Sequence, residues 1–145
     1  PLRLIELMPL TTADVLSEKN FMAVGEAMAM LRQRDELIPQ PDRHLGFGPA
    51  KYYLLKNTGA LVGFIGALTN LHFCESCNKM RLTADGKIRP CLGDQCEVDL
   101  RHALRHEPDD ETVRQLFMTA LQRKPLEHQF RGNYKPCRPM TAIGG

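Results

Sequence analysis

Three cysteines in a C-x2-C-x13-C pattern constrain this fold more than any other feature. Cys74 and Cys77 form the close pair, and Cys91 follows at a distance. The stretch 80–91 predicts a β-hairpin with Asp85-Gly86 in its turn. A hairpin folds Cys91 back beside Cys77, so the spacing predicts a device that closes a three-thiolate site.

The register of this hairpin depends on its turn. A two-residue turn would place Leu82 opposite Arg89. A three-residue turn over 84–86, with Gly86 left-handed, places Leu82 opposite Ile88, and it sorts the side chains more cleanly. One face then carries Met80, Leu82 and Ile88, and the other carries Lys79, Arg81, Thr83, Lys87, Arg89 and Cys91. We expect Lys87 and Arg89, which lie nearer the turn or beyond it, to face solvent.

The bulk composition limits the class of protein. The chain has 145 residues, 43% hydrophobic and 25% charged, which fits one globular domain of ordinary size. A net charge of +2 gives no argument for nucleic acid, and the longest apolar run, 60–68, is too short to span a bilayer. Five cysteines, an odd number, favour metal ligation in a reducing compartment. We therefore expect a cytoplasmic protein without a nucleic-acid or membrane partner.

The cysteines leave two metal sites open. Structural zinc needs a fourth ligand, which His72, Cys96 or Cys137 would supply, and it would make the chain a protein-contact module. A four-iron cluster on three thiolates leaves one iron open to a substrate. A redox pair or unligated thiols would leave the return of Cys91 unexplained, and an electron carrier suits the basic residues poorly. Lys79 and Arg81 beside an open metal favour an anionic ligand, such as a phosphate.

The remaining chain predicts a mixture of strands and helices. We expect strands over 2–8, 50–56 and 60–68, and helices over 20–34, 98–105 and 108–124. The proline-rich stretch 39–49 suggests a seam, and we place domains at 1–45 and 46–145. For the last twenty residues, composition alone favours a disordered tail.

Four segments together resemble a known family. The run F-C-E-S-C-N-K-M-R-L-T-A-D-G-K-I-R-P-C-L over 73–92 is similar to the C-terminal cluster motif of the GTP 3′,8-cyclases of molybdenum cofactor biosynthesis, which are radical S-adenosylmethionine enzymes. The segments 3–8, 50–53 and 143–145 resemble, in order, the last barrel strand, the strand before the cluster hairpin and the double-glycine terminus of that family. The resemblance spans the whole chain.

The resemblance implies a fold of the α/β to α+β class. It comprises the last strand and helix of an incomplete (βα)6 barrel, followed by a C-terminal β-hairpin and helix domain that binds a [4Fe–4S] cluster. In the family, a second [4Fe–4S] cluster and S-adenosylmethionine are held by the N-terminal barrel. The C-terminal cluster binds GTP through its open iron, and the complete enzyme is expected to be a homodimer.

The resemblance also implies roles for individual residues. Cys74, Cys77 and Cys91 hold the cluster. Met8 lies near S-adenosylmethionine, and the terminal pair Gly144 and Gly145 inserts into the active site as a catalytic element. The residues expected to contact GTP are Arg3, Lys79, Met80 and Arg81.

This sequence departs from the family pattern at two points. Lys79 stands where the family usually has arginine, which keeps the charge but loses a bidentate fork. The C-x3-C-x2-C motif of the barrel cluster is absent from the 145 residues. We therefore expect the chain to be the C-terminal part of a cyclase or one half of a split enzyme, inactive without the barrel portion or a complementary chain.

Overall fold

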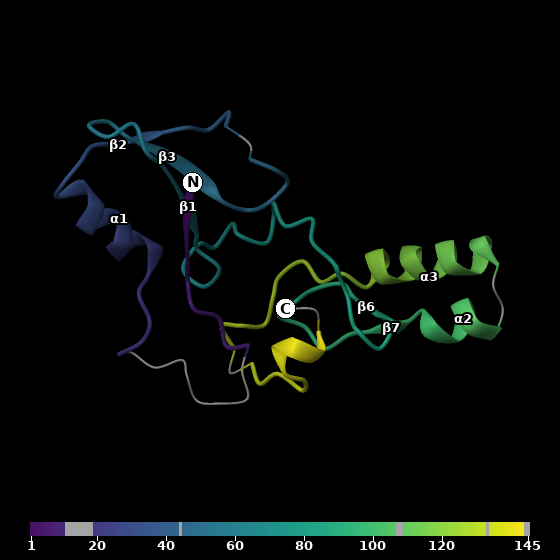
Figure 1. The fold of residues 1–145 in the computed structure, drawn as a ribbon. Coiled ribbons are helices and arrows are strands. Elements are labelled where there is room, and N and C mark those ends of the chain that lie inside the picture. Colours follow the sequence, from purple (N-terminus) through teal and green to yellow (C-terminus); the bar gives the residue numbers. More distant parts are fainter. Residues whose placement is uncertain (11–18, 44, 107–108, 133, 144–145) are drawn as a thin grey trace. The chain divides into compact units, whose positions relative to one another are not determined.

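The computed structural model describes residues 1–10, 19–43, 45–106, 109–132 and 134–143. The fold is mixed α and β, with two small sheets and few helices (Figure 1). The chain forms two compact units. The first unit is drawn from Pro1–Met8 and Val15–Asn78, and the second from Pro9–Asp14 and Lys79–Gly145. The division falls between Asn78 and Lys79, whereas the sequence suggested a boundary near residue 45, so the domain limits of the whole enzyme stay a prediction.

The first unit is built on a four-stranded sheet with the order β1-β4-β3-β2. The strands are β1 (Leu2–Ile5), β2 (Leu37–Pro39), β3 (Lys51–Leu55) and β4 (Leu61–Ile65). β1 runs parallel to β4, and the other two pairs are antiparallel. Asn57-Thr58-Gly59 turns the chain between β3 and β4, with Gly59 at a φ of 67° that suits glycine. β1 is thus an edge strand of this sheet.

One face of this sheet packs against helix α1 (Val24–Arg32), as Figure 1 shows. Residues alternate between the two faces of a strand, so every second side chain points towards the helix. Leu37, Val62 and Phe64 form the buried centre of this core. The half-buried residues that pack on it are Leu4, Val24, Ala27, Met28, Leu31, Tyr53 and Leu55.

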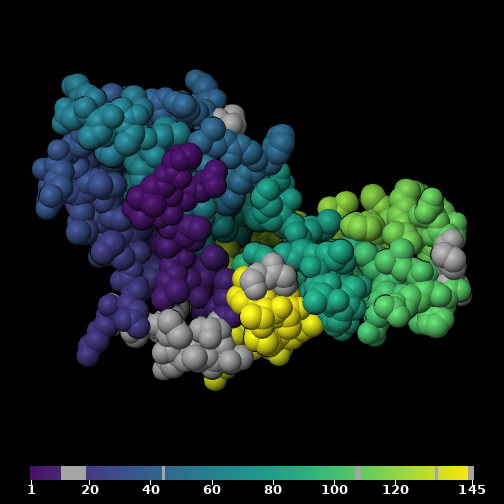
Figure 2. Space-filling model, viewed as in Figure 1, coloured from purple at the N-terminus to yellow at the C-terminus, as the bar shows by residue number. Residues whose placement is uncertain are grey.

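The second unit contains a three-stranded antiparallel sheet with the order β5-β6-β7. Its strands are β5 (Arg81–Leu82), β6 (Lys87–Arg89) and β7 (Val98–Asp99). Helices α2 (Arg101–His106) and α3 (Asp110–Gln122) follow, run in opposite directions and lie side by side (Figures 1 and 2). α3 covers the sheet through a core of Ile88, Val98, Leu100 and Ala120, with Met80 and Leu116 packed on it.

The C-terminal segment is folded where the structure describes it. Tyr134 and Ile143 are buried at 8% and 1% exposure, and a 3₁₀ turn, η1, spans Met140–Ala142. The composition-based expectation of a disordered tail is wrong for residues 134–143. Gly144 and Gly145 lie outside the described residues.

Most expected elements are present, but their limits differ. Helix α1 is shorter than the expected 20–34, β2 was not expected, and Val98 begins a strand rather than a helix. That β1 and α1 close an incomplete barrel in the whole enzyme stays a prediction. Among the described residues, no helix is long and apolar enough to cross a membrane.

Candidate functional site

The cysteine hairpin has the register that a three-residue turn predicts. Arg81 pairs with Arg89 and Leu82 with Ile88. Gly86 has a φ of 80°, and its N–H donates to the Thr83 carbonyl at 3.0 Å. The side chain of a larger residue here would also meet Arg101, since a Cβ would lie 3.0 Å from that of Arg101. Turn chemistry therefore fixes the hairpin locally.

The two faces of the hairpin carry the residues that this register predicts, but the exposure of these residues differs from the expectation. Arg89 is fully buried, and Lys87 is half-buried with its ammonium 3.3 Å from the Glu97 carboxylate. Our expectation that both face solvent is wrong, because later segments of the chain cover them. Leu82, expected on an apolar face, is 63% exposed. Among the cations of the hairpin, Lys79 is exposed and Arg81 is half-buried.

Arg89 fastens the hairpin to the loop that follows Cys91. Its Nε donates to the Asp94 carbonyl at 2.8 Å, and its Nη2 donates to the same carbonyl and to the Tyr134 hydroxyl at 2.9 Å. Nη1 has the Glu97 carboxylate 3.7 Å away and no hydrogen-bond partner within the described structure. Burial of an arginine is costly, and here the hydrogen bonds of Nε and Nη2 and the nearby Glu97 carboxylate offset that cost. Arg89 therefore serves structure rather than an external anion.

In the loop 90–94 around Cys91, most backbone carbonyls accept a hydrogen bond from a residue elsewhere in the second unit. The Tyr134 hydroxyl donates to the Leu92 carbonyl at 3.3 Å, and burial raises the pKa of that hydroxyl, which keeps it a donor. The Gln129 N–H donates to the Gly93 carbonyl at 2.9 Å, and its side-chain amide donates to Asp94. A Cβ at Gly93 would lie 2.8 Å from atoms of both His128 and Phe130, so these two side chains lie directly on this loop.

Lys124 closes the open end of the hairpin. Its ammonium donates to the Lys79 carbonyl and to the Pro90 carbonyl, both at 2.8 Å. The strand ladder ends at Arg81 and Arg89, so Lys79 and Pro90 lie beyond it. Lys124 bridges the two arms beyond that point. No spacing pattern pointed to this lysine, which looked like an ordinary charge at the end of a helix.

Cys74 and Cys77 lie in the loop that follows β4. The Cys77 N–H donates to the Cys74 carbonyl at 3.0 Å, a turn that brings the pair together. Nearby, the exposed His72 ring lies 2.8 Å from the Glu75 carboxylate. Cys96 and Cys137 belong to the second unit, and none of the five cysteines forms a disulfide.

A buried carboxylate anchors this cysteine loop to the start of the chain. Glu6, 2% exposed, follows β1 and accepts from the N–H groups of Val24 at 3.0 Å, Leu68 at 2.7 Å and Thr69 at 3.0 Å, and from the Thr69 hydroxyl. Burial alone would raise the pKa of this carboxyl group, but these hydrogen bonds outweigh it and hold the pKa below its ordinary value. Glu6 thus joins β1, the first turn of α1 and the segment leading to the cysteine pair.

Arg3 lies on the other face of the sheet, in a row with Gly63 and Tyr52. Arg3 of β1 and Tyr52 of β3 both pair with Gly63 of β4 in the strand register. The Arg3 Nε donates to the Tyr52 hydroxyl at 2.7 Å, and Nη2 lies 3.4 Å from the Leu45 carbonyl. A Cβ at Gly63 would approach Tyr52 to 2.8 Å and Arg3 to 3.3 Å, so glycine is required for the two side chains to meet above β4.

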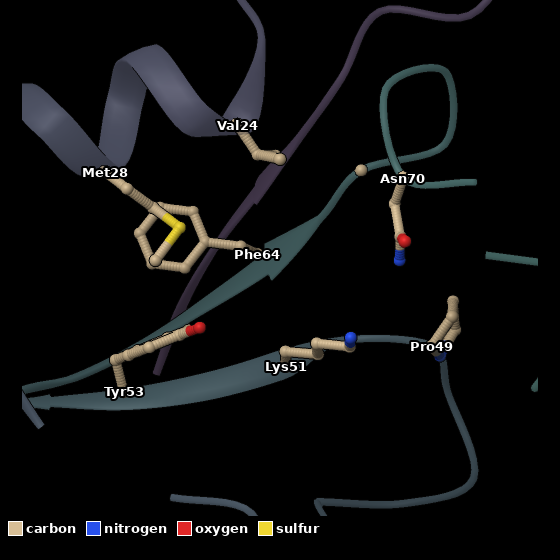
Figure 3. Close-up of a pocket in the computed structure, with 8 residues that line it drawn as sticks. Val24, Met28, Pro49, Lys51, Tyr53, Phe64 and Asn70 are labelled. Atoms are coloured by element: carbon tan, nitrogen blue, oxygen red, sulfur yellow. The ribbon is translucent and has the colours of Figure 1, made fainter. Parts of the chain in front are cut away.

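A small cavity of about 130 Å³ opens on the opposite face, where α1 packs. Figure 3 shows Met28 and Phe64 against one another, with Lys51 and Asn70 at the other side of the opening. Tyr53 lines this cavity, whereas its neighbour Tyr52 points to the face of Arg3. The cavity is therefore separate from the Arg3 row.

The remaining residues expected at the site are distributed over both units. Met8 is half-buried, and Met80 packs against the core of the second unit. Cys74 and Cys77 belong to the first unit and Cys91 to the second. Among the described residues, no three His, Cys, Asp or Glu side chains form a group that could hold a metal ion. That the three sulfur atoms come together stays a prediction.

A family model and several known proteins match this chain, and they indicate the same family. The family described as Molybdenum Cofactor Synthesis C matches residues 1–130. The chain is 38% identical over 143 residues to the GTP 3′,8-cyclase of Desulforamulus reducens and 39% identical over 146 residues to that of Pelotomaculum thermopropionicum. Each match covers 99% of this chain but only 44% of the relative, so the chain spans less than half the length of these relatives.

The resemblance inferred from the cysteine motif is thus confirmed, because these matches run over nearly the whole chain at 36–39% identity in several organisms. The chain belongs to the Molybdenum Cofactor Synthesis C family, and the curated relatives that it matches are GTP 3′,8-cyclases.

Proposed function

We propose that this chain is the substrate-binding part of a GTP 3′,8-cyclase in molybdenum cofactor biosynthesis. Cys74, Cys77 and Cys91 hold a [4Fe–4S] cluster, and GTP binds beside it. Two findings that agree carry the proposal. The relatives are GTP 3′,8-cyclases, and in this chain a hairpin that Lys124 bridges holds Cys91 on the arm facing the cations Lys79 and Arg81.

The donor set fits such a cluster. Thiolates are the ligands that iron–sulfur clusters take, and the five cysteines of the chain are present as thiols. A cluster held by three of them keeps one iron without a protein ligand, which supplies a Lewis-acidic site for a substrate nitrogen or oxygen. Lys79 and Arg81 carry the positive charge that a triphosphate requires, and Arg3 supplies a third cation from the first unit.

The remaining roles are proposed by the same correspondence. Met8 lies near S-adenosylmethionine, which is held with a further cluster by the barrel portion. Met80 contacts GTP, and Gly144 and Gly145 reach the reacting nucleotide. Because the C-x3-C-x2-C motif is absent from the sequence, the isolated chain does not cleave S-adenosylmethionine. The whole enzyme works as a homodimer in the cytoplasm.

Metal analysis after anaerobic reconstitution tests the proposal. The protein should be brown, absorb near roughly 400 nm and contain about four irons per chain. GTP should perturb this spectrum, and Lys79→Gln or Arg81→Gln should weaken the response. Arg34→Gln, an exposed charge after α1, is the control and should leave it unchanged.

Two outcomes would reject the proposal. Colourless protein with one tightly held zinc ion would instead support a structural zinc module that mediates protein contacts. Iron uptake without any response to GTP would separate the cluster from nucleotide binding.

A further inference from the structure

The mouth of the cysteine hairpin is closed by a side chain from outside the hairpin. The strand ladder of β5 and β6 ends at the pair Arg81 and Arg89, and the carbonyls of Lys79 and Pro90 lie beyond it. Lys124 lies between them, with its Nζ 2.8 Å from the Lys79 carbonyl and 2.8 Å from the Pro90 carbonyl. One ammonium group thus satisfies two facing acceptors.

The position of Lys124 is itself fixed by α3. The helix is capped at its start by Asp109, which accepts from the Thr112 N–H at 3.0 Å, and Ala120 and Leu116 anchor it in the core of the second unit. The Lys124 N–H donates to the Leu121 carbonyl at 3.1 Å. The half-buried side chain therefore starts from a rigid base, and its charge strengthens both hydrogen bonds.

The two carbonyls belong to functionally different residues. Lys79 is a proposed nucleotide contact, and Pro90 directly precedes Cys91, a proposed cluster ligand. Two carbonyl oxygens that face one another repel unless a donor lies between them, so removing the ammonium would let the arms separate.

We propose that Lys124 is a positioning residue that fixes the separation of Lys79 and Cys91. It touches neither the cluster nor the nucleotide. It acts through the backbone of both arms, so that the cation and the thiolate are presented in one arrangement before any ligand binds. The consequence for ligand binding rests on the proposed function, whereas the structural claim does not.

Lys124→Met tests the claim, because it keeps the aliphatic length and removes the donors. In anaerobic protein before reconstitution, the ¹³C carbonyl resonances of Lys79 and Pro90 should both shift. After reconstitution, iron per chain should fall by roughly half, and the Kd for GTP should rise about threefold or more. The control is Arg123→Gln, which removes the exposed charge next to it and should change none of these values.

A second variant covers the case in which Lys124→Met does not fold. Lys124→Gln keeps one donor group, so only one of the two carbonyl resonances should return to its wild-type position. Unchanged carbonyl resonances in folded Lys124→Met would overturn the inference. If the wild-type chain takes up neither iron nor GTP, the proposed function fails, while the carbonyl resonances still decide the role of Lys124.

Discussion

Arg3 shows how the absence of a side chain at Gly63 lets two other side chains meet. Gly63 leaves the space in which the Tyr52 ring lies across β4. The Tyr52 hydroxyl then accepts a hydrogen bond from the Arg3 Nε. The arginine is exposed, so without this bond it would sample many rotamers. Tyr52 therefore limits the positions that the Arg3 guanidinium can adopt.

Tyr52→Phe should weaken GTP binding through Arg3. The variant keeps the buried ring but loses the hydroxyl, so we expect the Kd for GTP to rise about three- to tenfold. Titration of reconstituted protein with GTP measures this change. Tyr53→Phe is the matched control, because that tyrosine points to the other face of the sheet. An additive effect of Tyr52→Phe and Arg3→Ala would show that the two residues act independently.

The residues proposed to bind could be named from the sequence, but the contacts that position them could not. The three cysteines and the cations Lys79 and Arg81 stand out because they lie in the single stretch 74–91. The contacts of Glu6 with Thr69, Tyr52 with Arg3 and Lys124 with Pro90 join positions that are 63, 49 and 34 residues apart. Such contacts exist only after the strands and helices have packed, and no local period encodes them.

Among the elements, the cysteine hairpin was the most predictable. Its turn requires a left-handed residue, and Gly86 supplies it, so local chemistry alone sets the register. Its surroundings were not predictable, because β7 pairs with β6 and the C-terminal segment covers Arg89. The expectation that Lys87 and Arg89 face solvent failed for this reason.

The C-terminal segment is tied to the hairpin by an ion cluster around Arg138. Its Nη1 donates to both oxygens of Glu97 at 3.0 and 3.1 Å, and its Nη2 donates to Asp85 at 2.9 Å and to the Ala142 carbonyl at 3.3 Å. Lys87 adds a second cation beside Glu97. One arginine thus connects the hairpin turn, the loop before β7 and the last described turn.

Arg138→Gln should loosen the C-terminal segment without unfolding the second unit. The N–H of Ile143, which donates to the Met140 carbonyl at 3.0 Å, should exchange with solvent faster, whereas the amides of α3 should not. Hydrogen exchange measured by mass spectrometry or NMR tests this. Raising the salt concentration should shift the wild type in the same direction, since ion pairs are screened. Lys135→Gln, at an exposed neighbouring position, serves as the control.

For the whole molecule, the sequence predicted the class of fold, whereas the domain limits stay a prediction. The mixed α and β composition of elements is confirmed, and most strands and helices lie where periodicity placed them. The compact units of this chain meet between Asn78 and Lys79, and the first unit contains both the pairing of β1 with β4 and the cysteine pair. A pairing between residues about sixty positions apart leaves no local signal.

Both units should lose stability in acid. Hydrogen bonds hold the pKa of Glu6 in the first unit below its ordinary value, and those from Arg138 and Thr83 do the same for Asp85 in the second. A lowered pKa contributes stability above the unfolded value of about 4, and this contribution is lost as the pH falls towards the folded value. Urea midpoints should therefore be level near neutrality and decline below about pH 5.

Glu6→Gln separates the two contributions. The variant should be less stable at neutral pH by about 1–3 kcal/mol, because its amide group presents hydrogens to backbone donors. Its stability should also depend less on pH than that of the wild type. An equally steep acid profile in the variant would assign the acid sensitivity to other carboxylates.

The hydrogen bonds that hold the loop 90–94 limit how short a peptide can be that keeps the shape of this loop. A peptide of residues 72–91 would contain every proposed thiolate and yet lack Lys124, Gln129 and Tyr134, the donors that shape the third cysteine's loop. Transplanting the motif into another scaffold would therefore give Cys91 without the donors that hold its loop. A portable version of this loop therefore has to extend at least to Tyr134.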